Sequence, residues 1–197
     1  MLVETLEGQA TELGWVHDND LGVGGDDYLR LVLKKTAWYS FIHPLRLGAL
    51  AAKGDDALLD RFNRYGYLMG LAFQITDDVL NLDGNEASYG KEIDGDLLEG
   101  KRTLILTHGY EHANPTDRAW IRQFLARPRE RRLPREVLRL REILQRGGSL
   151  DWARQAARAF AGAAALEFDR GAFAGVAPSP DLDWLRACVP YLVQRQV

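Results

Sequence analysis

The most informative segment of the sequence is FQITDDVLN, residues 73–81, near the end of a longer helical pattern at residues 62–83. Apolar residues recur there at helical spacing and predict one buried stripe, made of Phe62, Gly66, Met69, Phe73 and Leu80. Beside that stripe lie Gly70 and the polar residues Gln74, Asp77, Asp78 and Asn81. The pattern predicts a helix from Asp55 or Asp56 to about Leu82, with two adjacent carboxylates at the edge of its core face.

Two neighbouring carboxylates at the border of a core need an explanation. Burying unpaired charge is energetically costly, so Asp77 and Asp78 require a counter-cation. Mg²⁺ is such a cation, because it favours carboxylate oxygens together with substrate phosphates. The alternative is that both side chains face solvent or pair with arginines, which is the more common outcome for an isolated Asp-Asp pair.

The residues after this helix carry the second part of the pattern. The segment YGKEIDGDLLEGKRT, residues 89–103, is rich in glycine and carries Lys91 and Lys101. Such a loop can fold back over the helix end and bring ammonium groups to a phosphate held by metal. Another lysine pair, Lys34 and Lys35, precedes Thr36 in an earlier helical segment. The alternative is a solvated loop with ordinary surface lysines.

Composition places the chain among ordinary globular proteins. Its 197 residues are 46% hydrophobic and 27% charged, which excludes wholesale disorder. No apolar run approaches the roughly 18 residues of a membrane-spanning helix. The single cysteine, Cys188, excludes a disulfide scaffold. Residues 1–8 lack the basic start of a signal peptide, so we expect a cytoplasmic location.

The net charge of −3 hides an asymmetry between the two halves of the chain. Residues 1–100 carry 18 acidic and 8 basic side chains, whereas residues 101–197 carry 10 and 17. Carboxylates gathered in the first half suit a divalent metal better than nucleic acid. The Arg-rich segment at residues 127–146 contains glutamates and no aromatic residue. We interpret it as a solvated helical face and expect no nucleic-acid partner.

Helical periodicity continues along nearly the whole chain, with Gly and Pro between the periodic segments. A first helix opens at Leu2, and residues 17–25 end it. Residues 84–100 are expected to form a loop. Further helices are expected at residues 26–52, bent or broken near Pro44, and at 102–112, 116–127, 134–146, 150–174 and 181–195. We therefore predict an all-α fold in one domain, residues 1–197.

Several motifs, taken in order, resemble those of the trans-polyprenyl diphosphate synthases, which make geranylgeranyl diphosphate and related chains. FQITDDVLN, followed by Gly90-Lys91 and Gly100-Lys101, resembles the second aspartate-rich region of that family. The other matching motifs are Gly8-Gln9, Tyr28-Leu29, KTAWY at residues 35–39, and Tyr191-Leu192-Val193 with Arg195. The resemblance is strong over residues 7–107 and weaker beyond.

This resemblance implies the all-helical isoprenoid synthase bundle, with Mg²⁺ as cofactor. The implied substrates are an allylic prenyl diphosphate and isopentenyl diphosphate. The implied metal ligands are Asp77, Asp78 and Asn81, with Asp78 acting less directly. The implied substrate-binding residues are Lys35, Thr36, Gln74, Lys91, Asp96 and Lys101. Asp77, Asp78 and Lys35 would be catalytic, since metal and lysine stabilise the pyrophosphate that leaves as the allylic C–O bond ionises.

Two departures from the family pattern shape the prediction of function. Asn81 stands where the family motif ends in aspartate, so its side chain brings no charge to a metal. The family's first aspartate-rich motif and its basic isopentenyl diphosphate pocket lie upstream of the segment that matches Glu7. We therefore expect a truncated bundle, incomplete at its N-terminus, and no chain elongation by this chain alone.

Three functions stay open on the sequence. The first is a head-to-tail prenyltransferase that lacks its N-terminal half. The second is a noncatalytic or regulatory subunit of a complete synthase. The third is a class I terpene cyclase, whose second metal motif of Asn, Ser and Glu does not follow Asn81. We expect a homodimer, or a hetero-oligomer with a complete synthase, and no transmembrane segment.

Overall fold

A computed structural model describes residues 2–52, 59–83 and 92–195 of the protein. These residues form helices, turns and loops, with no strand among them, so the all-α prediction is confirmed. The elements are α1 (Leu2–His17), α2 (Gly25–Val32), the π-helical η1 (Leu33–Ile42), α3 (His43–Ala51), α4 (Arg61–Asp83), α6 (Gly95–Glu99), α7 (Leu104–His112), α8 (Pro115–Leu125), the 3-10 turn η3 (Arg129–Arg131), α9 (Pro134–Arg146), α10 (Ser149–Glu167), the π-helical η4 (Phe168–Ala172) and α11 (Pro180–Gln194).

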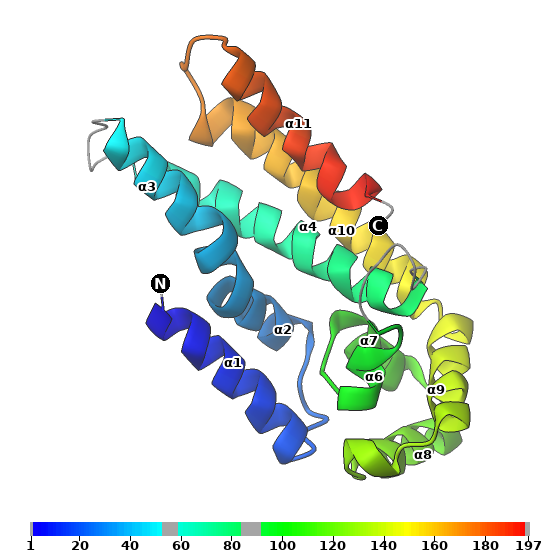
Figure 1. Ribbon diagram of the computed structural model, residues 1–197. Helices are drawn as coiled ribbons and strands as arrows, with labels where there is room; N and C mark the ends of the chain where they lie inside the picture. The colour runs from blue at the N-terminus through cyan, green and yellow to red at the C-terminus, as the bar shows by residue number, and fades with distance from the viewer. Residues whose placement is uncertain (1, 53–58, 84–91, 196–197) are drawn as a thin grey trace.

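Helix α4 lies at the centre of the molecule (Figure 1). It packs against η1 on one side and against α10 on the other. Helix α1 packs on η1 as an outer helix, and α11 lies along α10. Helices α6, α7, α8 and α9 gather at the end of the bundle where α4 ends. The fold therefore brings α1, α2, η1, α4 and α6 together around one region.

Two hydrophobic clusters hold this arrangement together. The first surrounds the C-terminal half of α4, including Ile75, and extends through α7, α8 and α9 to the start of α10, with Phe124 of α8 fully buried in it. The second joins the N-terminal half of α4 to the end of α10, η4 and α11 around Phe168. Because both clusters use α4, this helix is buried on several sides rather than along one stripe. Phe73 and Leu80, expected in the core, are only half-buried.

Glycine allows a close approach of helices at two crossing points. A Cβ atom on Gly70 would lie 2.5 Å from the Cβ atom of Ala37 in η1. A Cβ atom on Gly8 would lie 2.8 Å from the backbone nitrogen of Lys35. Both distances are well inside the contact distance of carbon atoms, so η1 fits between α1 and α4 only because these positions have no side chain.

Gly70→Ala is expected to destabilise the protein by about 2 kcal/mol, because the new methyl group overpacks the crossing with η1. Gly162→Ala is the matched control, since Gly162 lies on the exposed side of α10 with open space around its Cα. Alanine favours a helix over glycine, so the control should gain up to about 1 kcal/mol. Urea unfolding measures both changes, and two shifts of the same sign would contradict the packing argument.

Three local predictions differ from the structure. The helix expected at residues 26–52 contains the π-helical η1, and Pro44 fits the first turn of α3 without breaking the path. Helix α4 begins at Arg61, later than expected, while Asp55 and Asp56 lie outside the described residues. Helix α6 forms within the expected loop because the turn before it is bonded to Asn81 of α4. The last of these differences arises from hydrogen bonds between α4 and residues 92–96, which the local pattern does not show.

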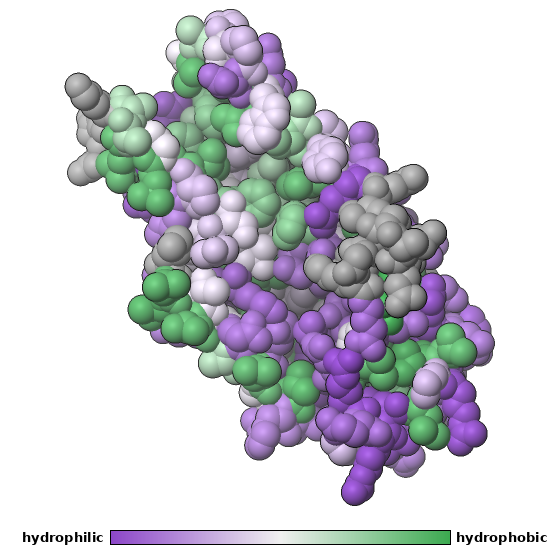
Figure 2. All heavy atoms as spheres, viewed as in Figure 1, coloured by the Kyte–Doolittle hydropathy of each residue, from purple (hydrophilic) through white to green (hydrophobic). Residues whose placement is uncertain are grey.

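The surface is unevenly apolar. Figure 2 shows apolar side chains over the outer part of α1 and between α3 and α11, and mostly polar ones over α8 and α9. On α1, Leu2, Leu6 and Leu13 share one face and are 59–68% exposed. In the part of the chain that the structure covers, every helix is too short or too polar to cross a bilayer.

Candidate functional site

A cavity of about 230 Å³ lies between α1, α2, η1, α4 and the segment that joins α6 to α7. Of the residues predicted from sequence, those that line it are Lys35, Thr36, Gln74, Asp77, Asp78, Asp96 and Lys101. Glu12, Tyr28, Arg102 and Thr103 also line it, together with Leu31 and Val32. The fold thus brings most of the predicted residues into a single site.

Asp78 is buried at the back of this cavity, with 5% of its surface exposed. The hydroxyl group of Tyr28 donates to its Oδ2 at 2.7 Å, and Nε2 of Gln74 donates to its Oδ1 at 2.9 Å. The hydroxyl group of Thr36 in turn donates to Oε1 of Gln74 at 2.8 Å. Burial, together with the charge of Asp96, raises the pKa of Asp78 to about 8, although its two hydrogen bonds oppose this shift.

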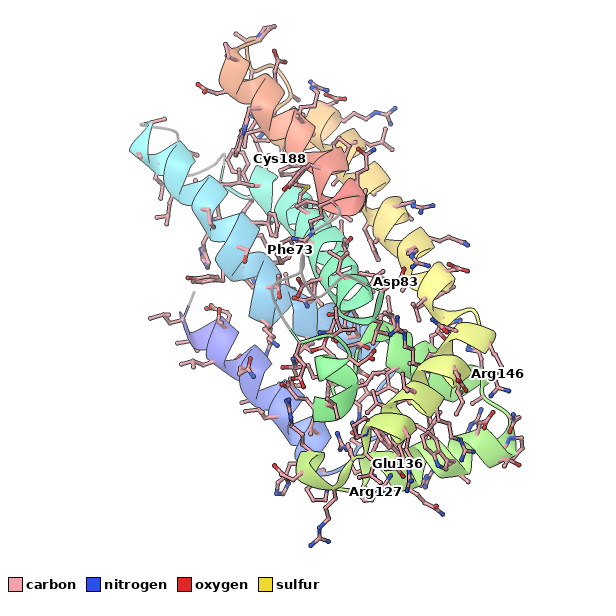
Figure 3. The ribbon with its side chains drawn as sticks, turned by 45° about the vertical axis from the view of Figure 1, so that its right-hand side comes forward. Phe73, Asp83, Arg127, Glu136, Arg146 and Cys188 are labelled. Carbon is pink, nitrogen blue, oxygen red and sulfur yellow. The ribbon has the colours of Figure 1, made fainter. Side chains whose placement is uncertain are left out.

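Asp77 has the more accessible carboxylate of the pair. Its side chain is 24% exposed, and Nη2 of Arg195 lies 3.6 Å from its Oδ1. The same guanidinium group lies over the ring of Phe73, 4.4 Å from the ring centroid. Phe73 is labelled midway along α4 in Figure 3. Arg195, which follows α11, therefore reaches back to the edge of the cavity.

Lys101 brings positive charge into the cavity. Its Nζ lies 2.6 Å from Oδ1 of Asp96 and 2.9 Å from Oε2 of Glu99. Burial opposes the charged form, but the two carboxylates outweigh it and raise the pKa of Lys101. Gly100 ends α6 with φ +71°, a left-handed conformation that suits glycine. This turn directs Lys101 back toward Asp96.

Lys35 is held by a residue that the sequence analysis missed. Its Nζ lies 2.5 Å from Oε2 of Glu12, which is 9% exposed. Helical spacing could have identified Glu12, because it follows Gly8 by one turn on the face of α1 that packs against η1. Tyr28 was noticed as part of a motif, but nothing in the motif identified Asp78 as its partner.

Arg102 was also missed, and it connects two loops beneath the site. It is 2% exposed, and its guanidinium group donates to the carbonyl of Asp20 at 2.7 Å and to Oδ1 of Asn19 at 2.9 Å. It also donates to the carbonyl of Gly100. Burial lowers the pKa of Arg102 to about 10. The loop between α1 and α2 is thereby attached to the end of α6.

Two predicted site residues are not among those that line the cavity. Asn81 faces the turn after α4, where its Nδ2 donates to the carbonyl of Glu92 and its Oδ1 accepts from the N–H of Asp96. Its role as a metal ligand stays a prediction, with both polar atoms of its side chain engaged by backbone. Lys91 lies outside the described residues.

Comparison with known proteins supports the resemblance seen in the motifs. A family model described as polyprenyl synthetase matches residues 1–141. Octaprenyl diphosphate synthase of Escherichia coli (strain K12) is 32% identical over 186 residues, 93% of this chain and 52% of that protein. Geranylgeranyl pyrophosphate synthase of Geoglobus acetivorans is 29% identical over 193 residues, 98% of this chain and 55% of that protein.

Solved structures of similar proteins share this fold. The geranylgeranyl pyrophosphate synthase from Corynebacterium glutamicum, complexed with isoprenyl diphosphate and magnesium, matches with a TM-score of 0.85 and 26% identity over 99% of this chain and 53% of that one. The polyprenyl synthase from Caulobacter crescentus CB15, complexed with calcium and isoprenyl diphosphate, matches with a TM-score of 0.84 and 27% identity over 98% and 56%.

The chain spans about half the length of these relatives. The match nevertheless extends over nearly all of the chain itself, so the predicted isoprenoid synthase bundle is confirmed. Because the family model covers most of its residues, this chain belongs to the polyprenyl synthetase family.

Proposed function

We propose that this protein acts as a head-to-tail prenyltransferase, in which this chain supplies the site for the allylic diphosphate. The observation that supports this most is the presence of Asp77, Lys35 and Lys101 around one cavity. A metal-bound diphosphate needs both kinds of charge, since a carboxylate binds the cation and ammonium groups neutralise the phosphate oxygens. Isopentenyl diphosphate is the proposed second substrate.

The residues of the site fit Mg²⁺ if the diphosphate completes its coordination. Among the described residues, no three His, Cys, Asp or Glu side chains are arranged to hold a metal by themselves. Mg²⁺ is commonly bound by one or two carboxylates together with substrate phosphates and water. Asp77 fits as the direct ligand because its carboxylate is accessible. Asp78 fits behind it, with both oxygens already accepting hydrogen bonds from Tyr28 and Gln74.

The roles of the other residues follow from where charge develops in the reaction. Bound Mg²⁺ supplies positive charge that stabilises the departing diphosphate. Lys35 and Lys101 add to this, since each ammonium group has three donors and its carboxylate partners leave room for a phosphate oxygen. Thr36 and Gln74, bonded to each other, line the cavity and would lie beside the start of the allylic chain.

The proposed condensation breaks one C–O bond and forms one C–C bond. The allylic C–O bond breaks, and its electron pair leaves with the diphosphate. The double bond of isopentenyl diphosphate then forms a new C–C bond to the allylic carbon. A proton is lost to the released diphosphate, which restores a double bond. Relatives named octaprenyl and geranylgeranyl synthases match this chain at 32% and 29% identity, so product length varies among proteins with this type of site.

A noncatalytic partner subunit is the second candidate function. One relative, the heptaprenyl diphosphate synthase component 2 of Geobacillus stearothermophilus, is 42% identical over 77 residues, and its name indicates an enzyme of more than one component. The exposed leucines of α1 would suit contact with another chain, either a second copy or a complete synthase. In this role the chain would bind the allylic substrate without elongating it.

Calorimetry with farnesyl diphosphate tests the proposed allylic site. We expect binding in Mg²⁺ and none in EDTA, and no heat under either condition would contradict the proposal. An assay with labelled isopentenyl diphosphate then tests the noncatalytic role. We expect the chain alone to form no elongated product, and substantial product would exclude the noncatalytic role.

A further inference from the structure

Residues 92–96 form the turn that leads into α6, and this turn is bonded to α4 through Asn81. Asn81 is 5% exposed and lies near the C-terminal end of α4. Its Nδ2 donates to the carbonyl of Glu92 at 3.1 Å, and its Oδ1 accepts the N–H of Asp96 at 3.0 Å. Its own backbone carbonyl accepts the N–H of Asp94 at 2.8 Å. Asn81 thus binds the backbone of residues 92–96 at three points.

The backbone conformation of this turn has to be stabilised by contacts with other parts of the protein. Asp94 adopts φ +60°, a conformation that residues other than glycine rarely take. The turn is also held by ion pairs of Glu92 with Arg129 and of Asp94 with Arg141. The first pair is about half exposed, and exposed ion pairs contribute little to stability. The second is mostly buried, but at 3.5 Å it is longer than a well-formed hydrogen bond. The buried amide of Asn81 is therefore the stronger attachment.

The turn also places charged groups of the site. It leads directly into α6, whose first turn contains Asp96. The carboxylate of Asp96 accepts from Nζ of Lys101 at 2.6 Å. Asp77 lies on α4, one helical turn before Asn81. A displacement of the turn would therefore move Asp96 and Lys101 relative to Asp77.

We propose that Asn81 is a positioning residue, whose amide docks residues 92–96 on α4 and so places Asp96 and Lys101 in the diphosphate site. The effect on the diphosphate rests on the proposed function, whereas the docking does not. An aspartate at 81 could accept the N–H of Asp96 but could not donate to the carbonyl of Glu92. Two oxygens would then face each other, and the turn would loosen.

Amide hydrogen exchange tests the docking. In the unmodified chain, the N–H groups of Asp94 and Asp96 should exchange slowly, and Asn81→Asp and Asn81→Ala should each accelerate both by at least about tenfold. The amide of Leu140 in the core of α9 reports global stability and should not change. Fast exchange of both N–H groups in the unmodified chain, or unchanged exchange in both variants, would overturn the proposal.

Asn114→Asp is the matched control for the exchange experiment. Asn114 caps α8 by accepting the N–H of Asp117 with its Oδ1 at 2.9 Å, and its Nδ2 donates to Oδ2 of Asp117 at 2.8 Å. A carboxylate keeps the cap and loses the amide donor, as Asn81→Asp does, but at the start of α8 rather than at residues 92–96. The same chemical change at this position should therefore leave exchange at Asp94 and Asp96 as it is. Faster exchange there in the control would mean that added negative charge, rather than the lost amide donor, loosens the turn.

Calorimetry separates positioning from metal ligation. A carboxylate is the better ligand for Mg²⁺, so if Asn81 binds metal, Asn81→Asp should keep or strengthen the Mg²⁺-dependent binding of farnesyl diphosphate. If Asn81 positions the turn, the same variant should weaken this binding about tenfold. An unmodified chain that binds no prenyl diphosphate would count against the proposed function, and the exchange experiment would still decide the docking.

Discussion

Asp77→Ala is expected to weaken the Mg²⁺-dependent binding of farnesyl diphosphate at least about 100-fold, as measured by calorimetry. Loss of an outer-shell partner typically costs a metal site about 10–100-fold in affinity, and loss of a direct ligand should cost at least as much. Asp77 is the accessible carboxylate of the site, and Asp78 cannot replace it because both of its oxygens accept hydrogen bonds.

Asp83→Ala is the control for this experiment. Asp83 lies at the C-terminal end of α4, as labelled in Figure 3, and pairs with Arg154 away from the cavity. The substitution Asp83→Ala removes one carboxylate from the same helix and should leave the dissociation constant of farnesyl diphosphate unchanged. Equal losses in the two variants would show a general charge effect, and unchanged binding by Asp77→Ala would refute the assignment of the metal ligand.

Asp78→Asn is expected to remove a strong pH dependence from the stability of the metal-free protein. The folded state keeps the Asp78 carboxyl protonated up to about pH 8, whereas the unfolded chain releases this proton near pH 4. Between these values the folded state binds more protons, so its stability falls as pH rises, by up to about 1.4 kcal/mol per unit. An asparagine cannot ionise; it keeps one acceptor oxygen for Tyr28 and loses the acceptor for Gln74, so the comparison uses the change of stability with pH and not the absolute stability.

Urea unfolding in EDTA at pH 5, 6.5 and 8 measures this dependence. The unmodified protein should lose stability across the series, and Asp78→Asn should lose much less. Asp83→Asn removes an exposed carboxylate from the same helix and should keep the decline. A decline of the same size in Asp78→Asn would show that other groups cause it.

Much of the helical fold could be predicted because its signals are local. Helix α9 runs from Pro134 to Arg146 as expected, since proline suits the first turn of a helix and Gly147 follows its end. The π-helical form of η1 could not be predicted, because the local pattern there is the same as that of an α-helix. It occurs where Ala37 packs against Gly70, a contact between distant parts of the chain.

The sequence predicts which acidic, basic and polar residues form the site, but it does not predict which of them bond to one another. Asp77 and Asp78 are neighbours in sequence, yet one step along a helix turns a side chain by about 100°, and only Asp78 becomes fully buried. Glu12 and Arg102 were missed because their partners, Lys35 and Asp20, lie 23 and 82 residues away. Only the packed fold shows such contacts.

The attachment of the loop between α1 and α2 determines which residues there are free to vary. Arg102 holds this loop through the side chain of Asn19 and through the main-chain carbonyl of Asp20, and the second of these groups is one that every amino acid possesses. Mutations at loop positions thus preserve the acceptor, whereas no other side chain reproduces the planar set of donors of a guanidinium group. Substitutions in residues 18–24 other than at Asn19 are therefore expected to keep an acceptor for Arg102, whereas any substitution of Arg102 is expected to release the loop.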